Sequence, residues 1–261
     1  MQSAYEHLYN EYGSVHPRLF FTILLAMSHT LPVCLHECMM LLIMRYNLFA
    51  DRIIQPNKAP LPALAAKCWR QSFINHFVLM PLFIWVFYPY ISGVMIVSPV
   101  VFPSVLEVGY HLLVCVIVED CLFYWSHRML HHPMVYKFFH KQHHEFKVLT
   151  GLSIAAEFTH PFESLVGNII PVVMGPIIAN CHFFTLCLWI VLRMFKTCDA
   201  HCGYSFQWSP FGLGFPLNPA ERHDFHHETG KGCFGSFFVV WDTVCGTDAD
   251  FLSRQRKNKV T

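Results

Sequence analysis

The sequence predicts an all-α, polytopic integral membrane protein with a helical, histidine-rich cap on its cytosolic side. Three observations predict this class: a low charged content, long stretches without any charge, and histidines at helical spacings. Of the 261 residues, 54% are hydrophobic and only 13% are charged, against roughly 25% in soluble domains. Such a chain cannot cover itself with polar surface, so we expect a membrane to cover part of it.

Several apolar segments are long enough to cross a membrane, for which a helix needs about 20 apolar residues. The stretches 71–106 and 164–192 contain no Asp, Glu, Lys or Arg. Pro171, Pro176 and the following Asn-Cys-His at 180–182 favour a bend in the second stretch, although a single crossing is the alternative. Helical spans are therefore expected at about 19–44, 76–100 and 104–126, and a membrane hairpin at about 164–195.

These segments predict three parts of the chain. Residues 1–110 form an N-terminal membrane region, residues 111–250 a catalytic domain, and residues 251–261 a basic cytosolic tail. Glu119 and Asp120 come near the end of a membrane segment, where acids are costly unless they reach the interface, so we expect them to anchor the chain there.

The orientation follows from the linker between Arg45 and Arg70, which holds five basic residues against one acid, Asp51. Short basic loops stay in the cytosol, so residues 127–163 and, with a hairpin, everything after Arg193 are expected there. The last five residues, KNKVT, are similar to dilysine retrieval signals, with an ordinary basic tail as the alternative. The first apolar segment is expected to act as a retained signal anchor. Together these features predict a multi-pass protein of the endoplasmic reticulum membrane.

Charge and cysteine content exclude other classes. The formal net charge is +1 and the basic residues are scattered, so no nucleic-acid partner is expected. The eleven cysteines include no C-x-x-C pair and several lie in apolar segments, where a free Cys packs as a small hydrophobe.

Eight of the 18 histidines fall into three short clusters. Residues three or four apart share one face of a helix, so each cluster is expected to present its imidazoles to a common point. Two metal ions with about four nitrogens each need eight imidazoles, whereas surface histidines would have no reason to repeat these spacings. The candidate metal ligands are His127 and His131; His140, His143 and His144; and His223, His226 and His227.

The clusters alone leave the metal open, since imidazole suits zinc, copper, iron and nickel. A hydrolytic zinc site with H-E-x-x-H is not present in the sequence. A metal transporter would place ionisable residues in mid-membrane, whereas the clusters lie outside the charge-free stretches. A binuclear site at a membrane surface suits iron and dioxygen better.

The clusters read H-x-x-x-H, H-x-x-H-H and H-x-x-H-H, and this order resembles the three histidine boxes of the fatty acid hydroxylase superfamily. Between about Asp120 and Asp248 the chain is similar to the C-4 methylsterol monooxygenase and sterol desaturase branch. Arg222 and Cys202 stand where that pattern commonly has His and Ser. The stretches that carry the resemblance are HRMLHH (127–132), YKFFHKQHHEF (136–146), AAEFTHPFES (155–164), DAHCGYSF (199–206), ERHDFHH (221–227) and WDTVCGTD (241–248).

The resemblance implies a membrane di-iron monooxygenase that uses O2 to hydroxylate a lipid C–H bond, most of all a sterol C-4 methyl group. It also implies electrons from NAD(P)H, delivered by cytochrome b5 and its reductase. The alternative substrates are a fatty acyl chain, a sphingoid base or the sterol side chain.

Five further residues are candidates for the same site. We hypothesise that His160 and His201, in the phrases EFTHP and DAHCGY at the two ends of the hairpin, are additional ligands. Their alternative role is to hydrogen bond a neighbouring box residue. Asp224, Glu157 and Asp199 are candidates to orient ligand imidazoles, or else ordinary acids at helix N-termini.

Overall fold

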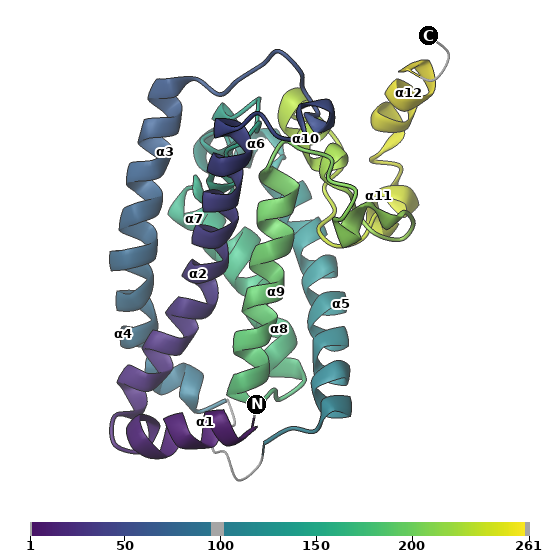
Figure 1. Ribbon diagram of the computed structural model, residues 1–261. Coiled ribbons are helices and arrows are strands. Elements are labelled where there is room, and N and C mark those ends of the chain that lie inside the picture. The colour runs from purple at the N-terminus through teal and green to yellow at the C-terminus, as the bar shows by residue number, and fades with distance from the viewer. Residues whose placement is uncertain (1, 95–101, 259–261) are drawn as a thin grey trace.

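The computed structural model describes residues 2–94 and 102–258, which form a bundle of long helices with a cap of short helices at one end (Figure 1). Within these residues the only β-structure is two isolated bridges, so the predicted all-α class is confirmed. The helix α1 (Gln2–Leu8) lies across the end of the bundle opposite the cap, and α2 (Pro17–Arg45) then runs along the bundle toward the cap.

The next rod returns from the cap. Helix α3 (Pro62–Ile74) continues through a π-helical turn, Asn75–Leu79, into α4 (Met80–Ser92). In the described residues, three helical stretches are long and apolar enough to cross a membrane: Pro17–Arg45, Pro62–Ser92 and Pro161–Ile178. The first matches the span expected at 19–44. The second begins earlier than expected at 76, and residues 95–100 of that expected span lie outside the described residues.

The segment expected at 104–126 is α5 (Val105–Leu130), which begins at a capping box formed by Ser104 and Glu107. It is not one of the three long apolar stretches. Glu119 and Asp120 on α5 do not anchor the chain at an interface, because both are buried. Glu119 lies 2.6 Å from Arg193, and Asp120 accepts the backbone N–H of Phe238 at 2.9 Å, so both acids have partners inside the protein.

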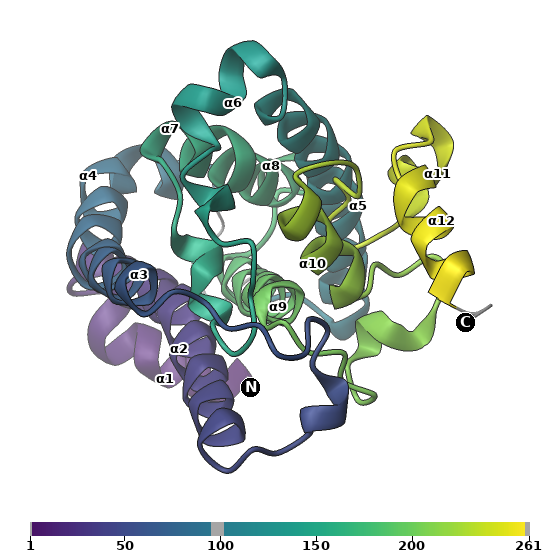
Figure 2. The ribbon, with the colours of Figure 1, turned by 90° about the horizontal axis from the view of Figure 1, so that it is seen from above.

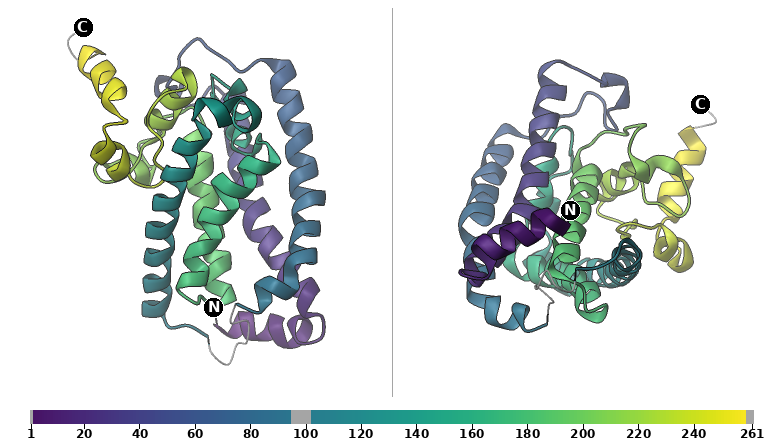
Figure 3. Two further views of the ribbon diagram at one scale, coloured as in Figure 1. Left: turned by 180° about the vertical axis from the view of Figure 1, so that it is seen from behind. Right: turned by 60° about the horizontal axis from the view of Figure 1, so that its bottom comes forward.

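The expected hairpin is present. One arm is built from α7 (Pro161–Glu163), a π-helical stretch at Ser164–Ile169 and α8 (Ile170–Ile178), and the other is α9 (Phe183–His201). The chain reverses around Asn180, whose φ of 48° is left-handed. Helix α8 packs closely along α5 (Figure 3), since a Cβ on Gly175 would lie 2.6 Å from Cα of Cys115.

The cap gathers segments from both halves of the chain, and Figure 2 looks onto it. The first two histidine clusters and the 46–61 linker lie at this end of the bundle. Because α8 and α9 form a hairpin, the chain returns to the same end and brings the third cluster there. The centre of the cap consists of α6 (Pro133–Phe139), α10 (Ala220–Thr229) and 3-10 turns at His143–Glu145 and Ser153–Glu157. Two further 3-10 turns, Ala50–Arg52 and Pro210–Leu213, also belong to the cap. The helices α11 (Val240–Cys245) and α12 (Ala249–Asn258) lie at its side.

The bundle is apolar both inside and outside. Helices α2 and α9 are joined by Phe21 and Phe183, whose rings stack at 4.2 Å. On the outer face of the α3–α4 rod, Phe73 and Leu82 are 62% and 56% exposed. Large exposed apolar surface of this kind is expected where lipid, not water, surrounds the helices.

Candidate metal centre

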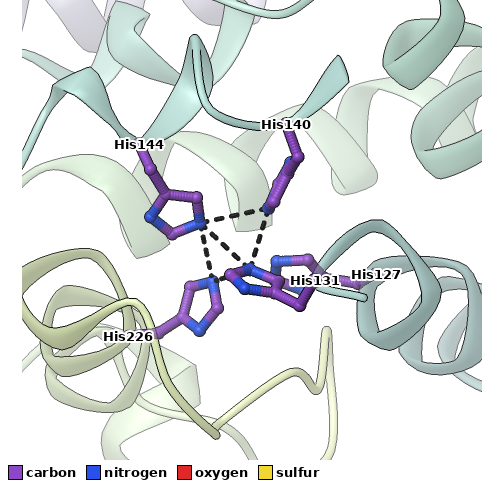
Figure 4. A group of neighbouring side chains, drawn as sticks. All are labelled: His127, His131, His140, His144 and His226. Carbon is purple, nitrogen blue, oxygen red and sulfur yellow. Dashed lines mark hydrogen bonds between the residues drawn. The ribbon is translucent and has the colours of Figure 1, made fainter. Parts of the chain in front are cut away.

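Nine imidazoles gather inside the cap in two groups. Within each group one nitrogen of every ring lies within 4.8 Å of the corresponding nitrogen of the others. Figure 4 shows that the rings of the first group come from opposite sides and point toward one another. The first group is His127, His131, His140, His144 and His226, and the second group is His143, His201, His223 and His227.

Four short segments position these rings. The last turn of α5 supplies His127, and the residue that caps it is His131. His140 caps α6, and the next turn carries the pair at 143–144. Helix α10 carries the third cluster, and α9 ends at His201. Because these segments pack against each other at one end of the bundle, residues far apart in sequence converge.

The spacings predicted one common point for each cluster, and for the second and third clusters this prediction is wrong. Neighbouring residues on a helix point about 100° apart. His143 and His144 consequently join different groups, and so do His226 and His227. The second and third clusters each contribute to both groups, which ties the two groups together.

Hydrogen bonds fix which nitrogen points inward. A carbonyl oxygen can only accept, so a ring whose Nδ1 faces a carbonyl must carry its proton on Nδ1, leaving a lone pair on Nε2. Four rings are held in this way. The pairs are His127 with Phe234 (3.0 Å), His226 with Gly232 (2.6 Å), His227 with Phe146 (2.9 Å) and His201 with Thr197 (2.8 Å).

The inward nitrogens are very close to one another. Nε2 of His131 lies 3.0 Å from Nε2 of His226, and Nε2 of His223 lies 2.9 Å from Nε2 of His201. Burial, followed by neighbouring imidazoles, holds the pKa of His223 and His226 well below 6.5, so these rings are neutral at pH 7. Converging neutral nitrogens with lone pairs are the donor set that a transition metal takes from histidine.

A buried carboxylate that the sequence analysis did not select supports the first group. Glu163 accepts the Nδ1–H of His140 at 2.8 Å, and both side chains are almost fully buried. Such a carboxylate fixes the ring and makes its other nitrogen more basic. Its sequence signal was an acid directly before the charge-free stretch 164–192, where an acid needs a partner.

The structure separates the two additional histidines. His201 lies in the second group. His160 lies in neither, because its Nδ1 accepts the backbone N–H of Phe162 at 3.1 Å and caps the short helix α7.

The three acids selected from the sequence lie away from the nine rings. Asp224 accepts a hydrogen bond from Gln55 at 2.7 Å, on the side of α10 that faces the 46–61 linker. Glu157 lies 3.8 Å from His76, beside α3 and not in the cap's two groups. Asp199 on α9 is half-buried, and Ser209 and Lys196 are the groups that act on its carboxyl.

A pocket adjoins both groups of imidazoles. Its lining includes His127 and His140 from the first group and His143, His201 and His223 from the second. Apolar side chains of α5, among them Phe123 and Leu130, form another part of the wall. Polar side chains of α9 and of the loops before α10 and α11 also line it: Arg193, Lys196, Thr197, Asn218 and Ser236. A molecule in this pocket would touch both groups at once.

Comparison with known proteins adds the family. Residues 112–247, about half of the chain, match the family described as fatty acid hydroxylase. The chain belongs to the fatty acid hydroxylase family. As a member of this family, similar over most of its length to monooxygenases, it is an oxidoreductase of the monooxygenase type.

Individual relatives are similar to this member of the family well beyond the matched region. Methylsterol monooxygenase erg25B of Aspergillus fumigatus is 35% identical over 85% of this chain and 76% of its own. C-4 methylsterol oxidase of Candida albicans is 36% identical over 79% and 68%. Very-long-chain aldehyde decarbonylase GL1-11 of Oryza sativa is 35% identical over 81% and 79%.

These shares extend the resemblance seen in the sequence. A similarity confined to residues 120–248 would cover only about half of the chain, so much of the segment before residue 120 also resembles the relatives. No solved structure matches this chain.

Proposed function

We propose that this protein is a methylsterol monooxygenase that oxidises a C-4 methyl group of a sterol, using two iron ions and O2. The observation that carries the proposal is the pair of buried imidazole groups with inward lone pairs beside one shared pocket. The names of the relatives supply the substrate class, since two of those compared act on methylsterols by name.

The ligands we propose are the nine rings of the two groups, without His160. Five rings for one ion and four for the other agree with the nitrogen-rich sites that iron accepts. Residues 111–250 would carry this catalytic part, and residues 1–110 would supply the N-terminal membrane region.

The chain's own residues prepare the site in three ways. The carbonyls that accept from Nδ1 fix the rings, and Glu163 fixes His140. Burial keeps the rings neutral and excludes bulk water. The pocket wall holds the substrate next to both groups. Two iron ions bound there would supply the activation of O2 that attack on a C–H bond requires.

We further propose that the capped end of the bundle, with the basic tail 251–261, faces the cytosol at the endoplasmic reticulum membrane. The basic linker after α2 lies at this end, which agrees with short basic loops remaining in the cytosol. Cytochrome b5 and its reductase, using NAD(P)H, would then deliver electrons from the same side.

The test is sterol profiling of cells that lack this protein. We expect these cells to accumulate 4-methylated sterols. Expression of the wild-type chain should reverse the accumulation, whereas a His144→Ala variant should not. Unchanged sterols would contradict the proposal.

A second function is favoured by one specific relative. The rice protein is named as an aldehyde decarbonylase, and its sequence identity to this chain is about the same as that of the fungal sterol enzymes. If the present chain acts on acyl substrates, the same cells would show altered long-chain aldehydes or hydroxylated acyl chains while sterols stay normal.

A further inference from the structure

The wall of the pocket contains a polar pair that the histidine centre does not use. Lys196 and Asn218 are each only 2% exposed, and both line the pocket together with rings of the two groups. The Nζ of Lys196 donates to the backbone carbonyl of Asn218 at 2.8 Å, so the two residues are neighbours. This pair lies beside the proposed metal centre, where a substrate must bind.

Lys196 has donors to spare. A Lys ammonium has three N–H groups, and the hydrogen bond to Asn218 uses one. The nearby Arg193 is paired with Glu119, whereas among the described residues no carboxylate forms an ion pair with Lys196. The ring of Phe211 lies 4.6 Å from its Nζ, and the carboxylate of Asp199, one turn further along α9, acts on the ammonium by charge without forming an ion pair with it. A buried cation with free donors is costly unless a further partner completes it.

Asn218 has an acceptor to spare. Its Nδ2 donates to the carbonyls of Gly235 and Ser236 at 2.8 and 3.1 Å, which fixes the orientation of the amide. Its Oδ1 is buried and has no hydrogen-bond partner within residues 2–94 and 102–258. Buried polar atoms nearly always have a partner, so an unpaired one in a pocket wall points to a bound donor.

The position of the pair relative to the metal centre is set by α9. Arg193, Lys196, Thr197, Ala200 and His201 all line the pocket and follow the helical spacing of one face. With a rise of about 1.5 Å per residue, Lys196 lies roughly 7.5 Å along the axis from His201. A small polar group held by Lys196 is therefore close to whatever atom faces the imidazoles.

We propose that Lys196 and Asn218 bind the C-3 hydroxyl of the sterol and thereby select 3-hydroxysteroids. This inference rests on the proposed function. The C-4 methyl and the C-3 hydroxyl are on adjacent ring carbons, so a methyl group placed at the metal centre brings the hydroxyl oxygen with it. A hydroxyl accepts one hydrogen bond and donates another, which matches the free donor of Lys196 and the free acceptor of Asn218.

The proposal predicts discrimination between C-3 substituents. A 3-deoxy analogue leaves both protein groups unpaired, and a 3-keto analogue leaves the Asn218 acceptor unpaired, because a ketone cannot donate. A site that hydrogen bonds a substrate hydroxyl strongly rejects analogues without that hydroxyl. Specificity would thus reside in the pocket wall, while the histidines carry the reaction.

The experiment compares kcat/KM of the purified, iron-loaded holoenzyme for 4-methyl sterols with a 3-hydroxy, 3-keto or 3-deoxy group. The wild type should prefer the hydroxyl by about 10- to 100-fold over the deoxy analogue, as loss of a hydrogen bond to a charged group predicts. Lys196→Met should lower this ratio several-fold, because only the contact with Asn218 remains. Lys196→Arg should restore much of the ratio, and Lys231→Met, on an exposed lysine outside the pocket, should leave it unchanged.

Three results would overturn the inference. Equal wild-type turnover of the hydroxy and deoxy analogues would refute it while leaving the proposed function intact. A Lys196→Met variant that lowers turnover of all analogues by one factor, with the ratio preserved, would show that Lys196 only supports the fold. Absence of turnover with every 4-methyl sterol would instead refute the proposed function, and this inference with it.

Discussion

The carboxylate of Glu163 and the Nδ1 of His140 lie 2.8 Å apart inside the cap, joining the start of the membrane hairpin to the second histidine cluster. Both side chains are buried, so removing one of them leaves the other without a hydrogen-bond partner, which costs free energy of folding. This contact makes the hairpin part of the proposed metal centre. It also provides a direct test of how the ligand rings are held.

Removal of this contact should weaken metal binding. Glu163→Ala is expected to lower metal affinity about 10- to 100-fold, whereas Glu163→Gln keeps an acceptor for the Nδ1–H and should lose less. Competition with a chelator measures the affinity. Glu157→Ala is the matched control, because that acid lies beside His76 and outside both groups. Equal affinity of Glu163→Ala and the control would show that the contact does not support binding.

The division of neighbouring histidines predicts a pattern of metal content. Replacing His223 and His227 together removes two rings of the second group only, so one ion should remain at wild-type affinity. Replacing His226 and His227 removes one ring from each group, so neither ion should keep wild-type affinity. Metal titration of the two double variants distinguishes them. Identical binding curves would mean that the two groups do not act as separate sites.

The two histidines at the ends of the hairpin should behave differently. His201→Ala removes a ring of the second group and should lose metal and turnover together. His160→Ala removes only a cap of the short helix α7, which costs about 0.5–2 kcal/mol of stability and should leave two ions bound. Metal analysis beside thermal unfolding separates the two effects. A His160→Ala protein lacking one ion would place that residue in the centre after all.

A prediction on stability concerns the ion pair between Arg193 and Glu119. Of the described partners of the fully buried Glu119, Arg193→Met leaves only the hydroxyl of Ser236, so it should destabilise the protein by about 3–5 kcal/mol. The exposed pair of Lys58 and Glu228 is the control, since Lys58→Met should cost under about 1 kcal/mol. Reversible unfolding in detergent gives both values. Similar losses would imply that water reaches Glu119.

Much of this organisation could be predicted from the sequence. The charge-free stretches predicted apolar helices, and Pro171, Pro176 and the residues around Asn180 predicted the hairpin. Repeated spacings selected eight of the nine converging rings, and the hairpin argument placed His201 beside them. These features are properties of single segments, which a sequence displays directly.

What the sequence did not reveal depends on contacts between segments. Local geometry turns His143 and His144 in different directions, but which group each ring joins depends on the rings that it meets after the cap has assembled. Glu119 seemed suited to an interface because its partner, Arg193, is 74 residues away. Glu163 was missed for the same reason, because its partner, His140, precedes it by 23 residues and lies in a different segment. Local spacing shows which residues share a face, but not what that face meets.

The most direct measurement of the central proposal is an oxygen-labelling assay. Purified, iron-loaded protein is supplied with a 4-methyl sterol, a reductant and isotopically labelled O2, and the product is analysed by mass spectrometry. We predict one labelled oxygen on the C-4 methyl carbon, with no product from a His144→Ala variant. Oxygen at any other carbon, or oxygen that originates from water, would contradict the proposed reaction.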